Sequence, residues 1–307
     1  MLTRREALQL LGAGLVAARD PSLRHGVAAQ SSLRAIARPI PSSGQELPVI
    51  GLGTWQTFDV SEDPPAREPL IGVLRAFVAL GGRLIDSSPM YGRSETVVGD
   101  IIRSESMRSQ LFVATKVWTT GKLAGIEQMK DSMQKLRTST VDLMQVHNLQ
   151  DVDTHLATLS DWKRDGIVRY IGVTHFMATH HDAVARVIQR HRVDTIQINY
   201  SVGEREAERR LLPLALDRGV AVIANRLFAG GTLLRRLRAK PLPAWAPDIS
   251  CTTWAQILLK FVVSHPAITC AIPATSKVEH VHDNMMAAQG RLPDDRLRAR
   301  IATAIGE

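Results

Sequence analysis

Four side chains that suit catalysis lie in or directly after apolar segments of the sequence. Asp86 and Lys116 each interrupt an apolar, β-branched run. Tyr91 follows the first run in a turn that contains proline and glycine, and His147 ends a third run. Because an unpaired buried charge is very costly, we expect an Asp86–Lys116 ion pair on adjacent strands. Each feature alone has a structural explanation, as a pair closing the end of a barrel or an ordinary core histidine, but together they are typical of a catalytic site.

These residues lie in a sequence pattern that repeats along the chain. Each repeat has a short apolar run, a turn and a helical stretch of roughly ten to sixteen residues. The predicted strands are 49–54, 83–87, 111–117, 141–147, 168–174, 194–200, 220–225 and 268–273. The predicted helices are 66–80, 94–106, 122–137, 153–165, 179–191, 204–217, 252–264 and 277–288.

Eight alternating units predict an α/β fold, the (β/α)8 TIM barrel, rather than an open doubly wound sheet. The strands are nearly continuous apolar runs, and no G-x-G-x-x-G opens the first unit. Segments 33–38 and 46–50 flank Pro-Ser-Ser-Gly and predict an N-terminal β-hairpin that closes the bottom of the barrel. We expect one domain over 31–307, with its chemistry at the C-terminal ends of the strands.

Residues 1–30 differ from ordinary globular sequence. Arg4 and Arg5 precede a short apolar run at 8–18, and cleavage is expected after Ala29. The pattern resembles a twin-arginine (Tat) leader and predicts a periplasmic protein. Charged residues crowd the segment before the cleavage site, so an amphipathic N-terminal helix on a cytoplasmic protein is the alternative.

Composition narrows the possible partners. The 307 residues carry a formal net charge of +8, and the arginines are spread over helical stretches such as RRLRAK, which we interpret as solvated faces. There is no zinc-finger spacing and no basic stripe interleaved with aromatics, so nucleic acid is not an expected partner. The apolar runs are too short for stable membrane insertion. Cys251 and Cys270 are predicted to be buried thiols, and we expect a monomer.

Seven stretches of the chain resemble the aldo-keto reductase family. They are GLGTW (51–55), IDSSPMYGRSETVVG (85–99), VATKVW (113–118), DLMQVHN (142–148), GVTHF (172–176), IQINYS (196–201) and IPATSKVEHVHDN (272–284). The resemblance extends from about residue 45 to 290. It implies a barrel enzyme that reduces a small-molecule carbonyl by hydride transfer from NADPH, with NADH possible.

The resemblance also implies a role for each of the four residues. Tyr91 would be the general acid, and Lys116 would lower the pKa of its phenol. Asp86 would keep Lys116 charged and in place. His147 would orient the substrate carbonyl by a hydrogen bond.

The family's cofactor contacts fall on eleven positions of this chain. They are Gly53, Thr54, Thr174, His175, Gln197, Asn225, Arg226, Thr275, Lys277, Asp283 and Asn284. The chain departs from the family at three positions, one of which is among these eleven. Asn225 stands where many members have a tyrosine that stacks on nicotinamide, and Ala274 and His280 stand where cations usually bind the 2′-phosphate. Lys277 is the nearest cation, and NADPH remains the better prediction.

The substrate is less constrained. Trp55, Met90, Trp118 and Phe228 are predicted pocket walls, although each also suits the core. The chain ends soon after the last predicted helix, and the loop after Lys116 is short, so we expect an open pocket for small aldehydes or ketones.

Two other classes of function stay open. A relative without turnover would bind the nicotinamide cofactor as a sensor or regulatory subunit. A metal-dependent barrel hydrolase would use His147, His175 and Asp86, but such enzymes tend to carry His-x-His on an early strand, which is absent here. No bound metal is therefore expected.

Overall fold

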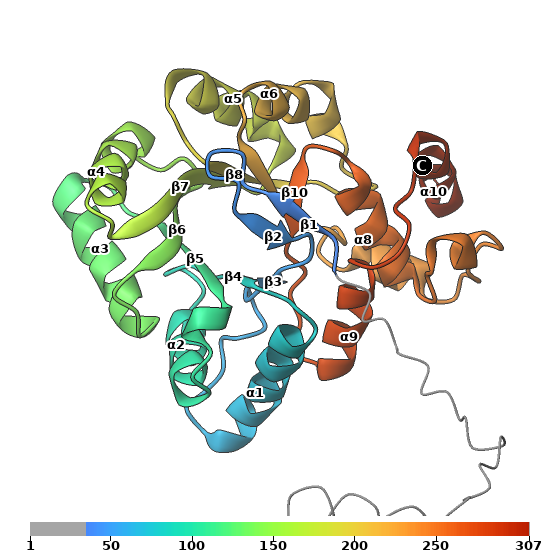
Figure 1. The fold of residues 1–307 in the computed structure, drawn as a ribbon, viewed down its shortest axis with the longest axis horizontal. Helices are drawn as coiled ribbons and strands as arrows, with labels where there is room; N and C mark the ends of the chain where they lie inside the picture. The colour runs from blue at the N-terminus through green and yellow to red at the C-terminus, as the bar shows by residue number, and fades with distance from the viewer. Residues whose placement is uncertain (1–34, 307) are drawn as a thin grey trace, which may run out of the picture. The chain divides into compact units, whose positions relative to one another are not determined.

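The computed structural model describes residues 35–306, so the predicted leader at 1–30 lies outside the described residues. Eight parallel strands form one sheet in sequence order (Figure 1). They are β3 Leu52–Gly53, β4 Leu84–Asp86, β5 Phe112–Val117, β6 Val141–His147, β7 Val168–His175, β8 Thr195–Asn199, β9 Ala221–Asn225 and β10 Ile268–Ala271. Each strand pairs in parallel with its neighbour, as a sheet built from βα units requires.

The sheet closes on itself, because its first and last strands also meet. Gly53 forms a parallel bridge with Ala274, and Ile50 forms one with Ala271. The Gly51 N–H donates to the Ala271 carbonyl at 2.8 Å. The predicted (β/α)8 barrel is therefore confirmed, and the open doubly wound alternative is wrong.

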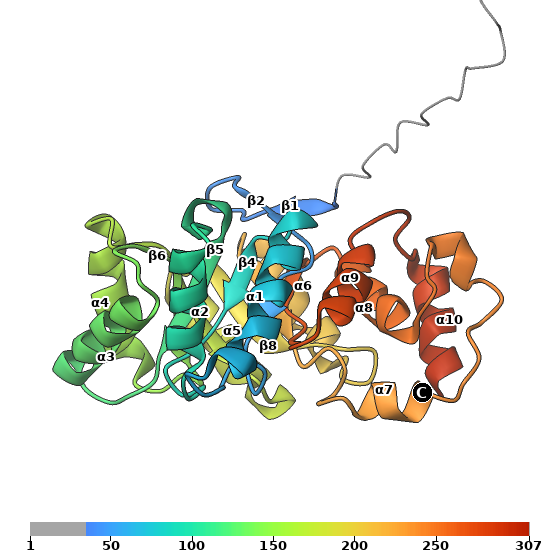
Figure 2. The same ribbon diagram turned by 90° about the horizontal axis from the view of Figure 1, so that it is seen from below.

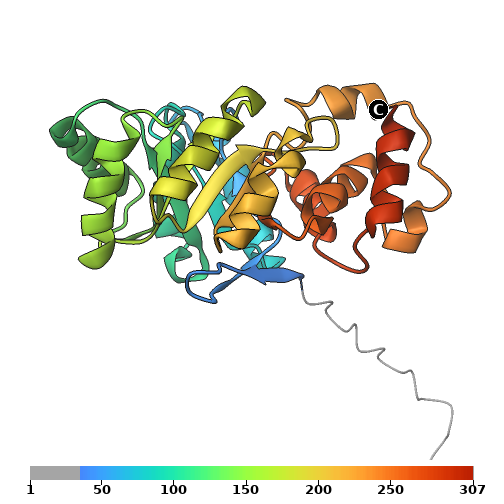
Figure 3. The same ribbon diagram turned by 90° about the horizontal axis from the view of Figure 1, so that it is seen from above.

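Helices surround the barrel (Figure 1 and Figure 3). The predicted helices correspond to α1 Pro64–Ala79, α2 Ser94–Ser104, α3 Lys122–Lys135, α4 Val152–Arg164, α5 His181–Arg190, α6 Leu211–Asp217, α8 Trp254–Ser264 and α9 Val278–Met286. Short 3-10 helices are η2 Arg108–Gln110, η3 Ala178–His180, η4 Glu206–Arg209 and η5 Ala246–Ile249. The helix predicted over 204–217 is divided into η4 and α6, because Pro213 lacks an N–H and its ring clashes with the carbonyl four residues earlier. Within the described chain, no helix has the length and apolar character needed to cross a membrane.

Two helices were not predicted. α7 Thr232–Leu237 follows β9, and α10 Asp295–Ile305 follows α9. The short segment after the eighth predicted helix therefore holds one more helix, α10. α10 packs beside α8, where the Arg298 guanidinium donates to the Ser264 hydroxyl at 2.7 Å. Three of its eleven residues are arginines, and they interrupt the apolar spacing of this helix in the sequence.

The N-terminal hairpin seals one end of the barrel. β1 Ala37–Pro39 and β2 Glu46–Pro48 pair antiparallel. The hairpin lies on one side of the domain, and α7 lies on the opposite side (Figure 2). Ile40 and Leu47 are buried in one cluster with interior residues of the strands. Those residues are Leu84, Phe112, Ala114, Leu143, Tyr170, Ala221, Ile223, Cys270 and Ile272. The predicted closure by a hairpin is confirmed.

Candidate active site

Asp86 and Lys116 form the ion pair that the sequence predicts. Asp86 ends β4, and Lys116 lies near the end of the adjacent β5. The Lys116 ammonium donates to an Asp86 carboxylate oxygen at 2.7 Å and to the Ser87 carbonyl at 2.6 Å. Burial lowers the pKa of Lys116, but the attraction of Asp86 and Tyr91 outweighs it and leaves the pKa raised. The buried ammonium is therefore charged.

Two glutamines hold the other oxygen of the Asp86 carboxylate. The Gln197 side-chain amide, on β8, donates to Oδ1 at 2.9 Å, and that of Gln145, on β6, donates to it at 3.4 Å. The Thr174 hydroxyl donates to the side-chain amide oxygen of Gln197 at 3.2 Å. The sequence analysis missed Gln145 and gave Gln197 no part in this network. Both oxygens of the carboxylate are satisfied, as a charge in a barrel interior requires.

A tight turn after β4 presents Tyr91. The Tyr91 N–H donates to the Ser88 carbonyl at 3.0 Å, across a turn with proline at its second position. Gly92 has a φ of +58°, which glycine adopts without strain, and a Cβ there would lie 2.3 Å from the Asp59 carboxylate and force that side chain to shift. The Lys116 ammonium lies 5.0 Å from the centroid of the half-buried Tyr91 ring.

Burial dominates the pKa of the Tyr91 phenol. Burial raises this pKa, the positive charge of Lys116 lowers it and Asp86 raises it, with a net increase. The prediction that Lys116 brings the net pKa down is therefore wrong, although its own contribution has the predicted direction. The phenol is protonated at neutral pH, which is the form that a proton donor needs.

The His147 imidazole is neutral and meets Tyr91 edge to face. The two ring centroids are 5.9 Å apart, and the ring planes are inclined by 82°. Its Nδ1 lies 3.0 Å from the Ser88 hydroxyl oxygen. Burial lowers the pKa of His147 to about 2, and the charges of Lys116 and His175 act in the same direction. His147 is thus a neutral hydrogen-bonding group at physiological pH.

One cavity of about 770 Å³ opens over these residues. It extends across the C-terminal ends of the strands, from β4 and β6 to β9 and β10 and on to α7, α8 and α9. The sequence-predicted residues that line it are Gly53, Thr54, Trp55, Asp86, Met90, Tyr91, His147, Thr174, Gln197, Asn225, Arg226, Phe228, Thr275, Asp283 and Asn284. Lys116 is fully buried behind this lining. The fold thus brings together residues from positions 53 to 284.

Two predicted cofactor residues do not line the cavity. The His175 ring stacks on His180, with 3.7 Å between centroids. Adjacent residues of a strand point to opposite faces, and Thr174 is the one that lines the cavity. The Lys277 ammonium lies 3.9 Å from the Glu279 carboxylate, and both side chains are exposed. His175 and Lys277 thus lie outside the lining of the cavity, and their assignment to the cofactor stays a prediction.

The predicted apolar walls divide in the same way. Trp55, Met90 and Phe228 line the cavity, whereas Trp118 does not. The Trp118 ring lies at the rim, 6.4 Å from the His147 ring centroid, and is 40% exposed. Trp118 thus stands at the edge of the cavity, and its assignment as a wall stays a prediction.

The cavity also has lining residues that the sequence analysis did not single out. They include Phe176 after β7, Gly230 and Gly231 before α7, Leu234, Leu237 and Arg238 on or next to α7, and Trp254 on α8. Arg238 belongs to the RRLRAK stretch that was interpreted as a solvated face. Its guanidinium has no hydrogen bond or ion pair to any residue of 35–306. The sequence shows a basic run after the seventh predicted strand. Because α7 was not predicted, nothing in the sequence placed this run at the cavity.

The polar residues on the α8 and α9 side of the cavity are linked to one another. The Thr253 hydroxyl donates to the Asp283 carboxylate at 2.9 Å, and the Gln256 amide donates to it at 2.7 Å. The Thr275 hydroxyl lies 3.3 Å from the His280 Nδ1. Thr253 and Gln256 at the start of α8 thus hold the Asp283 carboxylate in place by hydrogen bonds within the protein.

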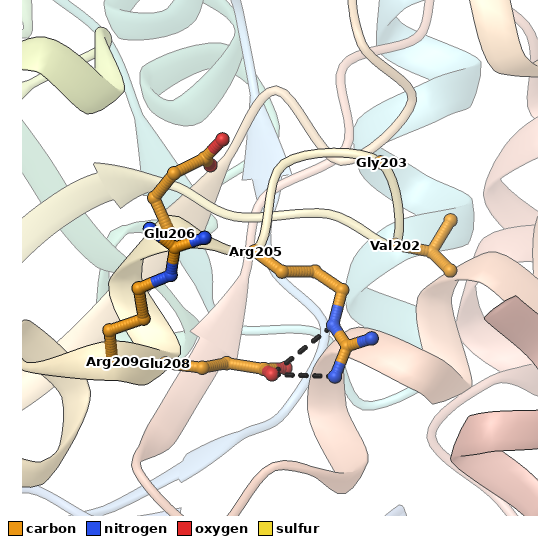
Figure 4. Close-up of a pocket in the computed structure, with 6 residues that line it drawn as sticks. All are labelled: Val202, Gly203, Arg205, Glu206, Glu208 and Arg209. Carbon is orange, nitrogen blue, oxygen red and sulfur yellow. Dashed lines mark hydrogen bonds and ion pairs between the residues drawn. The ribbon is translucent and has the colours of Figure 1, made fainter. Parts of the chain in front are cut away.

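A second hollow of about 490 Å³ lies on the segment after β8 (Figure 4). It is lined by Val202, Gly203, Arg205, Glu206, Glu208 and Arg209. Glu208 accepts hydrogen bonds from Arg205 at 2.7 Å and from Arg298 of α10 at 2.8 Å. None of the predicted site residues lines this hollow, and its charges connect the segment to α10.

Residues 35–306 hold no cluster of metal-binding side chains, and their two cysteines are buried. Within 35–306, no three His, Cys, Asp or Glu side chains are grouped so that they could hold a metal ion. Cys251 and Cys270 are free and buried, as predicted. Burial raises the pKa of Cys251 to about 11 and also raises that of Cys270, so both are protonated thiols.

The barrel, the cavity at its C-terminal end and the buried ion pair define a class of barrel enzyme. Residues 49–302 match the sequence model of the Aldo/keto reductase family, and the chain belongs to that family.

Named relatives and solved structures agree with this membership. Methylglyoxal reductase YeaE of Escherichia coli (strain K12) is 29% identical over 266 residues, which cover 83% of this chain and 90% of that protein. Methylglyoxal reductase DkgB of Escherichia coli O157:H7 is 25% identical, with coverages of 82% and 91%. The crystal structure of an aldo/keto reductase from Klebsiella pneumoniae in complex with NADP and acetate superimposes with a TM-score of 0.72. It is 26% identical and covers 85% of this chain and 92% of that one.

Proposed function

We propose that the protein is an NADPH-dependent reductase of aldehyde or ketone carbonyls, with Tyr91 as general acid. The observation that carries the proposal is the convergence of the Asp86–Lys116 pair, Tyr91 and His147 beside one cavity. The Klebsiella relative, which is described in complex with NADP, supports the choice of cofactor.

The lining of the cavity fits a nicotinamide cofactor. Asn225 lines the cavity, and its buried Oδ1 has no hydrogen-bond partner among residues 35–306. An unsatisfied buried acceptor of this kind suits a carboxamide N–H. Thr275 and Arg226 add a hydroxyl and a guanidinium, which are groups that bind phosphate. Asn225, Arg226 and Thr275 are therefore assigned to hold the cofactor, which supplies the hydride when it is bound.

Ala274 and His280 stand where the family usually has cations that bind the 2′-phosphate of NADPH. We propose that Arg238 supplies this positive charge instead. α7 brings it to the cavity, which Thr253 and Trp254 also line, and the Trp254 indole donates to the Lys240 carbonyl at 2.8 Å. This bond holds the segment after α7 against α8, which in turn holds Asp283 of α9. Because a guanidinium matches the geometry of phosphate, we assign the 2′-phosphate of NADPH to Arg238 and expect NADPH to bind more tightly than NADH.

The protein's own residues handle the proton. Tyr91 gives its phenolic proton to the carbonyl oxygen as that oxygen gains negative charge, and the product is an alcohol. The Lys116 ammonium stabilises the phenolate that forms, and Asp86 holds the ammonium in place. Neutral His147 orients the carbonyl by hydrogen bonding. The raised pKa of Tyr91 keeps the proton in place until the transfer.

We propose small 2-oxoaldehydes such as methylglyoxal as the first substrates to test. Two relatives are named methylglyoxal reductases. The walls Trp55 and Met90 are partly exposed, at 47% and 39%, so the cavity is open beside Tyr91. An open apolar wall favours small carbonyl compounds without demanding one shape.

The test is NADPH oxidation with methylglyoxal by the purified protein and by Tyr91→Phe. We expect Tyr91→Phe to lose at least about a hundredfold in turnover while NADPH binding changes little, because only the acidic hydroxyl is removed. Tyr170→Phe, at the sealed end of the barrel, is the matched control and should retain turnover. Turnover that survives in Tyr91→Phe would contradict the mechanism. Tight NADPH binding without turnover on any carbonyl would favour the sensor alternative.

We further propose that residues 1–30 direct export to the periplasm. The support is the sequence alone, in which Arg4 and Arg5 precede a short apolar run. Cell fractionation of the full chain and of the double variant Arg4→Lys/Arg5→Lys tests this. Periplasmic protein that disappears in the variant is expected, whereas cytoplasmic protein in both cases would support the alternative of an N-terminal helix.

A further inference from the structure

Ser88 links the two residues that face the substrate. Its carbonyl accepts the Tyr91 N–H at 3.0 Å, and its hydroxyl oxygen lies 3.0 Å from Nδ1 of His147. Ser88 is fully buried and does not line the cavity, whereas both of its partners do. It therefore acts on the site through Tyr91 and His147 and not by touching a ligand.

The hydrogen bonds of the Ser88 hydroxyl determine whether Ser88 or Nδ1 of His147 is the donor between them. The Met90 N–H donates to the Ser88 hydroxyl oxygen at 3.4 Å. A hydroxyl has one proton to donate, and a neutral imidazole has one nitrogen that donates and one that accepts. If His147 Nδ1 donated to Ser88, the hydroxyl proton would have no acceptor among residues 35–306. If the hydroxyl donates to Nδ1, both the hydroxyl proton and the Nδ1 lone pair have a partner.

The other ring nitrogen of His147 is left for the cavity. Nε2 makes no hydrogen bond within residues 35–306 and is not among the buried atoms that lack a partner. Because His147 lines the cavity, this nitrogen faces the space that a carbonyl would occupy.

We propose that Ser88 is a positioning residue that fixes the Nε2–H tautomer of His147. The ring then presents a donor to the substrate oxygen and not a lone pair, which would repel that oxygen. The catalytic consequence rests on the proposed reductase function, but the tautomer itself does not.

The tautomer is measured on the full chain without cofactor. Nitrogen-15-labelled histidine reports by NMR which ring nitrogen carries the proton, and His147→Gln assigns the signals of His147 among the 10 histidines. The expected result is a protonated Nε2 and an unprotonated Nδ1. A proton on Nδ1 of His147 in the wild-type protein overturns the proposal.

Ser88→Ala then tests the role of the hydroxyl. We expect His147 to lose its single tautomer and kcat to fall about ten- to a hundredfold, with NADPH binding unchanged, because the ring is no longer held. Ser132→Ala, which removes another fully buried serine hydroxyl, on α3, is the matched control and should keep both properties. A single Nε2–H tautomer that persists in Ser88→Ala overturns the proposal, whatever the turnover. If the tautomer results hold but the wild-type protein reduces no carbonyl, the proposed function fails and the assignment of the tautomer stands.

Discussion

The two ends of the barrel are built on the same eight strands but carry opposite chemistry. At the end where the strands begin, Ile40 and Leu47 of the hairpin pack on apolar interior residues. At the end where the strands finish, the interior holds Asp86, Lys116 and Gln197 in one hydrogen-bonded network. Burial of apolar area stabilises the first end, whereas the second keeps buried charge only because each polar group has a partner. Stability and chemistry are thus assigned to opposite ends of one sheet.

The largest effect is expected from breaking the ion pair. Lys116→Met leaves the Asp86 carboxylate buried beside two glutamines and without a cation. Removing one partner of a buried pair costs about 3–5 kcal/mol of unfolding free energy, and turnover should be lost as well. Urea unfolding and NADPH oxidation measure the two losses.

A double variant separates stability from function at this end. In Asp86→Asn/Lys116→Met no buried charge is left unpaired, so stability should recover most of the way while turnover stays absent. If the double variant is as unstable as the single one, the pair itself stabilises the fold, and the contrast between the two ends is weaker than argued.

The sealed end should respond in the opposite way. Leu47→Ala opens a space beneath the barrel and should lower the free energy of unfolding by about 2–4 kcal/mol, because Leu47 is buried. NADPH binding should be unchanged. Leu123→Ala, at a residue that is 76% exposed, is the control and should change stability little. A loss below about 1 kcal/mol for Leu47→Ala would mean that the hairpin does not seal the barrel.

The contrast also explains what the sequence could predict. A charge inside an apolar strand has few permitted partners, so the Asp86–Lys116 pair followed from residue types alone. The net pKa of Tyr91 did not follow, because burial of the phenol depends on the packed turn and outweighs Lys116. Gln145 and Ser88 were missed because uncharged polar residues in or next to a strand give no such signal.

Acid should lower the free energy of unfolding partly through His147, at the catalytic end of the barrel. His147 has a pKa of about 2 in the folded protein, against 6.5 for an ordinary histidine. Below about pH 6.5 the unfolded chain therefore binds a proton that the folded chain does not, so the free energy of unfolding falls as the pH is lowered. This residue contributes up to about 1.4 kcal/mol per pH unit, or about 2 kcal/mol by pH 5. Urea unfolding of His147→Gln from pH 7.5 to 5 should give a shallower decline than that of the wild-type protein, and parallel curves would contradict this prediction.

The α7 side of the cavity shows where sequence reasoning had least to work with. Lys277 lies close in the sequence to the lining residues Thr275 and His280, yet it pairs with Glu279 outside the cavity. Arg238 is far from those residues in the sequence and reaches the cavity only because α7 lies against α8. An exposed charge needs no partner within the protein, so its neighbours cannot be predicted from residue types. Only the folded path of the chain shows which exposed charge lies at the cavity.

The smallest predicted effect tests that assignment. Arg238→Ala should weaken NADPH binding about tenfold, equivalent to about 1.4 kcal/mol, and should leave NADH binding nearly unchanged, because only NADPH carries the 2′-phosphate. Tryptophan fluorescence titrations of both cofactors measure the two affinities, and Arg235→Ala on the same helix, outside the lining, is the matched control. The tenfold difference should shrink as salt is added, since the guanidinium is exposed to solvent. Equal losses for NADPH and NADH would assign Arg238 to the pyrophosphate shared by both cofactors, and no loss for either would leave the 2′-phosphate to Thr275 and His280.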